Sequence, residues 1–235
     1  MAVSTPRLVL VVALALALLS GLVFAATEAF TKEETRVQTL GAGVERVLVH
    51  ADAGDVRLVG STAPRVTVRS ESRWLLRKPR VTAGRRGELL VLRGDCPPQA
   101  LRARCGADFT VEVPFDVDVE VDGDAGDIEV EDLAGNIRLR TDAGDITGSG
   151  LQPATVRVHT DAGDVRLAFD TSPALVDAFS DAGDVAITVP EGEYRIDTAT
   201  DAGDVTLDGV LRNDRAVRRI VAETRAGDVT VRGRS

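Results

Sequence analysis

The stretch TDAGDVRL at residues 160–167 returns as SDAGDVAI at residues 180–187 and as TDAGDVTL at residues 200–207. Its centre, Ala-Gly-Asp followed by Val or Ile, occurs seven times in the chain. The motif glycines and the aspartates that follow them are Gly54 and Asp55, Gly126 and Asp127, Gly144 and Asp145, Gly163 and Asp164, Gly183 and Asp184, Gly203 and Asp204, and Gly227 and Asp228. A weaker eighth copy, LAGNI, occupies residues 133–137. Such a repeat indicates stacked structural units.

The spacing of the motif indicates the size of each unit. From Gly126 onward, successive motif glycines are 18, 19, 20, 20 and 24 residues apart. A period near twenty is typical of a solenoid, in which each unit contacts only its neighbours. Other turn-forming residues fall near the middle of these gaps: Gly135, Pro153, Pro173, Gly192 and Asn213. Each period therefore predicts one coil with two strands and two corners.

Between the corners, apolar and polar residues alternate. The positions seven before and two after each motif glycine hold only Val or Ile, whereas Arg57, Glu129 and Arg166 lie between apolar positions. This period of two predicts strands with one buried and one solvated face. The composition is 44% hydrophobic and only 3% aromatic, which suits a narrow aliphatic core. The predicted fold is all-β: a single-domain β-solenoid with a period of about 20 residues, preceded by one N-terminal hydrophobic helix.

The corner residues have separate structural explanations. Glycine adopts positive φ at low cost, and an aspartate beside a turn can accept local backbone hydrogen bonds. We therefore interpret each Ala-Gly-Asp as a structural turn. The weaker alternative is a calcium-binding column, because calcium prefers oxygen ligands and stacked carboxylates repel one another. The motif lacks the Gly-Gly-x-Gly-x-Asp pattern of calcium-binding β-rolls, so no metal or cofactor is predicted.

The first forty residues predict export. Residues 8–26 carry no charge and would span about 28 Å as a helix, near the thickness of a bilayer core. We favour a single-pass anchor at 8–26, with a short cytoplasmic end at 1–7 and a polar linker at 27–40. The alternative is a signal peptide cleaved after Ala25, which would release a secreted protein. The remaining chain, 41–235, is predicted to be the extracytoplasmic domain, irregular over 60–118 and regular over 119–231.

Two cysteines, Cys96 and Cys105, bracket a segment rich in proline and arginine. In an exported domain they are predicted to form a disulfide. A zinc site built on these cysteines would need further ligands, and the chain has only two histidines, His50 and His159.

Charge is distributed unevenly along the chain. Residues 61–110 have eleven Lys or Arg against four Asp or Glu, whereas residues 111–235 have twelve against twenty-seven. The predicted partners are the membrane, through the N-terminal helix, and an envelope polymer or protein. Nucleic acid is not expected as a partner, because the domain is exported and lacks aromatic residues for stacking on bases.

Several segments resemble a known family, the bacterial "putative adhesin" domains of unknown function that are built from β-strand repeats. The resemblance covers about residues 40–235 and is strongest to membrane-anchored actinobacterial members. The segments that carry it are the N-terminal apolar span, GDVRLVG at 54–60, Trp74 with KPRV at 78–81, the two cysteines, and FTVEVP at 109–114. The resemblance implies a β-solenoid-like fold at the cell envelope and no catalytic residues.

We therefore predict a non-enzymatic cell-envelope protein that presents its solenoid for adhesion or for contact with a protein or polymer. One alternative is a polysaccharide-active enzyme, since right-handed β-helices often carry such activities. The sequence lacks the Gly-x-Ser-x-Gly, His-Glu-x-x-His and phosphate-loop motifs that mark several enzyme classes. Another alternative is an envelope-stress or regulatory module, although the predicted cytoplasmic end is too short for a signalling domain.

Overall fold

The computed structural model describes residues 31–98 and 105–234. All regular elements of these residues are β-strands, twenty in number. The described residues include no helix long and apolar enough to cross a membrane. The short end predicted at 1–7 and the hydrophobic helix predicted at 8–26 lie outside the described residues.

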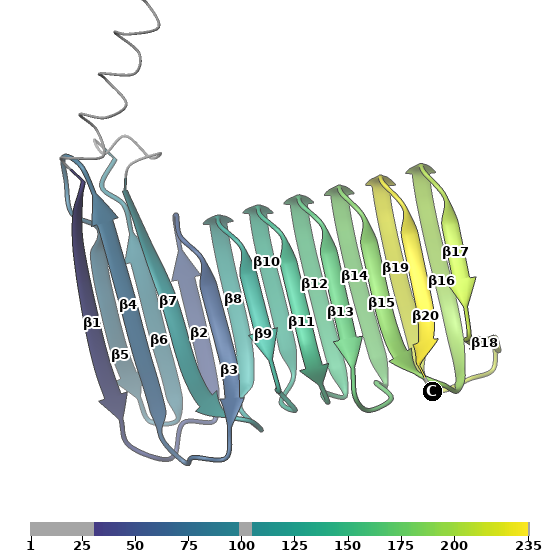
Figure 1. Cartoon of the computed structure of the whole chain (residues 1–235). Coiled ribbons are helices and arrows are strands. Elements are labelled where there is room, and N and C mark those ends of the chain that lie inside the picture. The colour runs from purple at the N-terminus through teal and green to yellow at the C-terminus, as the bar shows by residue number, and fades with distance from the viewer. Residues whose placement is uncertain (1–30, 99–104, 235) are drawn as a thin grey trace, which may run out of the picture.

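The strands form two ten-stranded sheets that face each other across a long core (Figure 1). In spatial order, sheet A consists of β1 (Lys32–Leu40), β4 (Val66–Trp74), β7 (Cys105–Pro114), β3 (Val56–Ser61), β9 (Ile128–Glu131), β11 (Ile146–Leu151), β13 (Val165–Phe169), β15 (Val185–Pro190), β20 (Val229–Arg234) and β17 (Val205–Asp208). Sheet B consists of β18 (Leu211–Arg212), β16 (Glu193–Ala202), β19 (Arg219–Ala226), β14 (Leu175–Ala182), β12 (Thr155–Ala162), β10 (Ile137–Ala143), β8 (Asp118–Ala125), β2 (Arg46–Ala51), β6 (Leu89–Asp95) and β5 (Arg80–Arg86).

Each coil combines one strand of sheet B with the strand of sheet A that follows it in the chain. Neighbouring coils pair in parallel with their motif positions aligned, as in the pairing of Val156 with Ile137 on one side and with Val176 on the other. The motif corners lie along one edge of the stack and the midway turns along the opposite edge (Figure 1). The predicted solenoid-like coil of two strands is therefore present. Residues 133–137 lie at the edge opposite the motif corners, so they are not an eighth copy of the corner.

The core consists of aliphatic columns between the sheets. The residues seven before the motif glycine are all buried: Val47, Val119, Ile137, Val156, Val176, Ile196 and Ile220. The residues two after it are buried in six of the seven coils. The exception is Val205, which is 44% exposed because β17 is the edge strand of sheet A. The predicted alternation of buried and solvated positions is confirmed.

The coils do not follow the order of the chain at either end of the stack. The last coil, β19–β20, lies between β14–β15 and β16–β17, and the first coil, β2–β3, lies between β6–β7 and β8–β9. Each coil pairs only with its neighbours in the stack, as expected of a solenoid, but at both ends of the stack these are not its neighbours in the chain. Long gaps follow Gly54 and Gly203, and they give the chain enough length to pass over one coil and return.

The N-terminal end of the stack carries antiparallel strands. β4 pairs with β7, β1 pairs with β4, and β5 pairs with β6, all antiparallel. The prediction of a linker at 27–40 is therefore wrong from Lys32 onward, where the chain forms β1. This strand pairs with backbone groups of β4 that would otherwise be unpaired at a sheet edge. Residues 60–118, predicted to be irregular, supply the coil β6–β7 as well as the covering strands β4 and β5.

Candidate functional site: the corner edge and the outer face of sheet B

The motif glycines are held at the corners by conformation and by contact. Their φ values range from 126° at Gly54 to 152° at Gly203, a region that side-chain-bearing L-residues rarely adopt. A Cβ on Gly183 would also lie 2.1 Å from the carbonyl oxygen of Gly163, the corner glycine of the neighbouring coil β12–β13. Each corner therefore requires glycine both for its φ and for the close approach of the next coil.

The aspartates that follow these glycines form a continuous hydrogen-bonded row, which we call the aspartate ladder. The backbone N–H of each member after the first, Asp108, donates to the Oδ1 atom of the member before it in the stack, over 2.8–3.1 Å. The members in spatial order are Asp108, Asp55, Asp127, Asp145, Asp164, Asp184, Asp228 and Asp204. Because each bonded carboxylate accepts a backbone N–H, aspartates can stack at the spacing of neighbouring strands.

Asp108 is the member that the sequence pattern missed, because it follows Ala107 and not a glycine. It accepts the N–H of Asp55 and pairs with Arg73. Burial raises the pKa of the Asp108 carboxyl above its ordinary value, although the Asp55 N–H and the charge of Arg73 oppose the shift. Its position after a small residue at the start of an alternating strand is the signal that could have found it.

A second column consists of hydroxyl residues three positions before five of the seven motif glycines. Thr141, Thr160, Ser180, Thr224 and Thr200 each donate their hydroxyl to the carbonyl oxygen of the motif glycine in the preceding coil, over 2.8–3.3 Å. All of them except Thr200 are buried. The small size of the residue leaves room at the inside corner, and the hydroxyl satisfies a carbonyl there.

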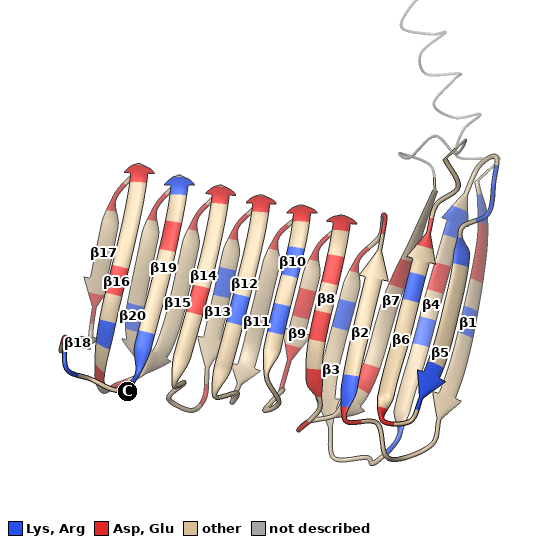
Figure 2. Ribbon diagram, turned by 180° about the vertical axis from the view of Figure 1, so that it is seen from behind, with Lys and Arg blue, Asp and Glu red and all other residues tan. Residues whose placement is uncertain are grey.

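A row of acids lies on the outer face of sheet B beside the corners, at the position two before the motif glycine; we call it the outer acid row. Its acids in spatial order are Asp95, Asp52, Asp124, Asp142, Asp161, Asp181 and Asp201. Asp95 precedes no motif glycine but lies beside Asp52 at the end of β6, and Arg225 takes the position between Asp181 and Asp201. Figure 2 shows acidic tips on most of these strands and a basic tip on β19. Arg225 makes a 2.7 Å ion pair with Asp181, and Arg140 lies 3.5 Å from Asp142. Arginines therefore offset part of the like-charge repulsion in this row.

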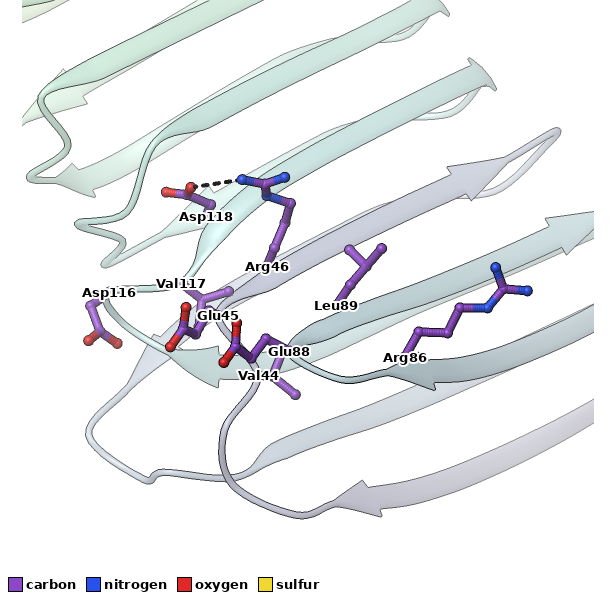
Figure 3. Close-up of a pocket in the computed structure, with 9 residues that line it drawn as sticks. All are labelled: Val44, Glu45, Arg46, Arg86, Glu88, Leu89, Asp116, Val117 and Asp118. Atoms are coloured by element: carbon purple, nitrogen blue, oxygen red, sulfur yellow. Dashed lines mark ion pairs between the residues drawn. The ribbon is translucent and has the colours of Figure 1, made fainter.

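Shallow hollows lie on the outer face of sheet B at the opposite edge. One of about 570 Å³ is lined by Arg46 of β2, Arg86 of β5, Leu89 of β6 and Asp118 of β8, together with Glu45, Glu88 and Asp116 from the connections (Figure 3). Arg46 points toward Asp118 at 3.8 Å, while Arg86 extends along the far side. The lining residues include no histidine, cysteine or serine, and the hollow offers mainly charged contacts.

The two cysteines are joined in a disulfide. Cys96 follows β6 directly and Cys105 begins β7, so the bond closes the connection between the two strands of one coil. The backbone N–H of Cys96 also donates to Oδ2 of Asp52 at 2.9 Å. The disulfide therefore lies next to the outer acid row.

Comparisons with known proteins give a family and a fold. A family model described as Toastrack DUF4097 matches residues 111–233, more than half of the chain. No curated protein matches the sequence significantly.

Two crystal structures share the fold. A "putative cell adhesion protein" from Clostridium sporogenes has a TM-score of 0.53 at 12% identity, covering 86% of this chain and 100% of that chain. A "putative adhesin" from Bacteroides fragilis has a TM-score of 0.50 at 14% identity, covering 86% of this chain and 97% of that chain. Neither these names nor the family description refers to an enzyme, and at such low identity the likeness shows the fold alone.

Proposed function

Since this chain belongs to the Toastrack DUF4097 family, we propose that it is a non-enzymatic protein of the cell envelope that makes adhesive contacts. In this proposal the solenoid is extracytoplasmic and binds an anionic polymer or an acidic surface of another protein. Residues 8–26 anchor it in the membrane, and the names of the two similarly folded proteins agree with an adhesive role.

The observation that carries the proposal is a pair of adjacent arginines on the outer face of sheet B. Arg138 in β10 and Arg157 in β12 are cross-strand neighbours, and both are exposed. Among the residues that the structure describes, neither makes an ion pair, although most arginines near them do. A hollow of about 410 Å³ lies beside them and is also lined by Arg46, Asn136, Asp118 and Glu120. Glu120 is the cross-strand neighbour of Arg138, and Asp177 is that of Arg157. Two adjacent free guanidinium groups suit carboxylate or phosphate groups, which they can bind bidentately.

The shape of the face favours an extended partner. The outer face of sheet B is a grid whose rows are separated by the spacing of neighbouring strands, about 4.8 Å. A polymer or a protein strand that lies across the strands would meet the same kind of position at each step. An enclosed cavity, which a small molecule would need in order to bury most of its surface, is a poorer match for these open hollows.

The test is binding of the purified protein to isolated envelope from its source organism. We expect saturable binding that weakens as salt is raised, because the proposed contacts are exposed ion pairs. Arg138→Gln with Arg157→Gln should weaken binding about tenfold or more. The matched control is Arg65→Gln with Arg232→Gln, which removes two exposed arginines from the sheet A side and should bind as the unaltered protein does.

Protease treatment of the envelope separates the two kinds of partner. Binding that survives treatment identifies a polymer, and binding that disappears identifies a protein. Equal binding by both double variants would refute the proposed face, and no binding of the unaltered protein to its own envelope would refute the contact function. Membrane fractionation with N-terminal sequencing tests the anchor, and a mature chain beginning at Ala26 would refute it.

A further inference from the structure

Three potential metal ligands converge where the outer acid row meets the disulfide. His50 lies near the end of β2, Asp52 directly follows that strand, and Asp95 ends the neighbouring strand β6. Because Ala51 pairs with Gly94, the side chains of Asp52 and Asp95 lie side by side on the outer face. One imidazole nitrogen and one carboxylate oxygen from each aspartate lie within 4.8 Å of one another.

The spacing within this group fits a small divalent cation. Nε2 of His50 lies 3.6 Å from Oδ1 of Asp52. Zinc bonds of about 2.0–2.2 Å in a tetrahedral site place ligand atoms about 3.3–3.6 Å apart. One imidazole and two carboxylates are a zinc-type ligand set, with the fourth position open to water.

Two of the three ligands are oriented by other groups. The other ring nitrogen of His50, Nδ1, lies 3.4 Å from Oδ2 of Asp122 on β8. A histidine that ligates a metal commonly donates its second N–H to such a carboxylate, which fixes the tautomer and the direction of the ring. Oδ2 of Asp52 accepts the backbone N–H of Cys96, which the disulfide tethers to Cys105. Oδ1 of Asp52 thereby stays directed toward the imidazole.

The third ligand is free to bind. Within the described part of the chain, the side chain of Asp95 makes no hydrogen bond and no ion pair. His50 and Asp52 are only about one-third exposed, at 32% and 27%. The group is thus partly shielded from solvent and holds an uncommitted carboxylate.

The chain contains its own comparison for this group. His159 and Asp161 occupy the same positions of their coil as His50 and Asp52, with Nε2 and Oδ1 2.8 Å apart. His159 stacks on Phe179 in the next coil, at 5.1 Å between ring centres. In the described ranges no third ligand joins this second pair. The repeat alone therefore does not make the site; the position of Asp95 at the end of β6 completes it.

We propose that His50, Asp52 and Asp95 bind one divalent cation of the zinc class, with Asp122 as a positioning residue for His50. The site joins β2 to β6, whose closest ends are 38 residues apart in the chain but which are adjacent in sheet B. Calcium should bind it far more weakly, because calcium prefers an all-oxygen ligand set.

The test measures zinc binding by the full-length, metal-free protein in competition with a chromophoric chelator. The unaltered protein should bind one equivalent, and cobalt should give the visible spectrum of a tetrahedral site. His50→Gln and Asp95→Asn should each weaken binding more than about tenfold, and Asp122→Asn by about 10–100-fold with an altered cobalt spectrum. The matched controls His159→Gln and Asp201→Asn, from the same two columns, should bind as the unaltered protein does.

Other outcomes would overturn the proposal. The proposal is wrong if the unaltered protein shows no saturable zinc binding, if the site and control variants lose zinc affinity equally, or if calcium binds more strongly than zinc. A direct readout needs no variant: cobalt should broaden or shift the ring-proton NMR signals of His50 before those of His159, and the reverse order would place the ion elsewhere. Circular dichroism melting of each metal-free variant confirms that the fold is retained.

Discussion

The backbone N–H of Asp228 donates a 2.8 Å hydrogen bond to Oδ1 of Asp184, although 44 residues separate them. Asp204, which lies between them in the chain, comes after Asp228 in space and donates its own N–H to Asp228 over 2.9 Å. The final coil of the protein is therefore an internal coil of the stack. Its strand β20 has hydrogen-bonded neighbours on both sides, β15 and β17, whereas β17 forms an edge (Figure 1).

Hydrogen exchange should reveal this order directly. The amides of β20 should exchange more slowly than those of β17, although β20 lies nearer the C-terminus, because an edge strand opens at lower free energy. The measurement is amide exchange resolved to these two strands by NMR or mass spectrometry. Faster exchange in β20 than in β17 would indicate that the coils stack in chain order.

Three glycine substitutions should show how much more a corner glycine contributes to stability than a glycine in a left-handed turn or in open space. Gly183→Ala should destabilise the protein by several kcal/mol, because it combines a positive φ with a 2.1 Å contact to backbone. Gly87→Ala has a φ of 62° but open space around its Cβ, so strain alone should cost about 1–2 kcal/mol. Gly84 has neither constraint, and Gly84→Ala is the control.

Urea unfolding of the three variants provides the measurement. The expected order of destabilisation is Gly183 first, Gly87 second and Gly84 last. Equal effects at Gly183 and Gly87 would show that the φ of 148° and the contact with Gly163 together add nothing to the cost of a left-handed conformation.

The aspartate ladder predicts a difference between an internal and a terminal member. Asp184→Ala removes the acceptor for the N–H of Asp228 and should cost about 1 kcal/mol. Asp184→Asn keeps an oxygen acceptor and should recover most of that loss. Asp204→Ala is the matched control, because among the described residues no backbone N–H donates to the Asp204 carboxylate. Thermal or chemical unfolding measures all three, and a loss at Asp204 as large as at Asp184 would contradict the role of the ladder.

The disulfide should contribute to stability as well as to geometry. Cys96 and Cys105 are nine residues apart, and closing a loop of that length in the unfolded chain stabilises the folded state by about 2–3 kcal/mol. We expect Cys96→Ser with Cys105→Ser to lower the free energy of unfolding by that amount. Thiol labelling under denaturing conditions without reductant checks the bond itself, and two reactive thiols would show that it is absent.

Asp108 should give the protein a pH dependence with a defined sign. Its pKa in the folded state is raised above the ordinary 3.8, mainly by burial. Between 3.8 and that raised value the folded state binds more protons than the unfolded state, so the contribution of Asp108 to stability falls as pH rises. Asp108→Asn removes this titration. The free energy of unfolding of the unaltered protein minus that of the variant should fall through this window and then level off, as measured by urea unfolding at about pH 3–6. A difference that rises with pH would contradict the direction of the shift.

The local pattern of the sequence was sufficient to predict a coil of two strands and two corners. Alternating aliphatic residues specify which face of each strand is buried, and the motif glycines mark the corners, because both depend on residues close together in the chain. The same pattern indicated stacked columns, and residues such as Val156 and Val176 do lie in one. The assignment of residues up to 40 to a linker failed because the charges in Lys32–Leu40 conceal a strand whose partner is distant in the chain. The paired residues of β1 and β4 are separated by 42 positions at Lys32 and Trp74 and by 26 positions at Leu40 and Val66.

Only the tertiary structure decided which coil lies next to which. The coils present nearly identical columns, so each could stack on any other, and nothing within one coil specifies its neighbour. The choice depends on the connections at the two ends. They allow β2–β3 to lie between β6–β7 and β8–β9, and β19–β20 to lie between β14–β15 and β16–β17. The same non-local choice puts Asp108 at the head of the aspartate ladder and Asp95 beside Asp52, because parallel pairing brings together residues that no short stretch of sequence connects.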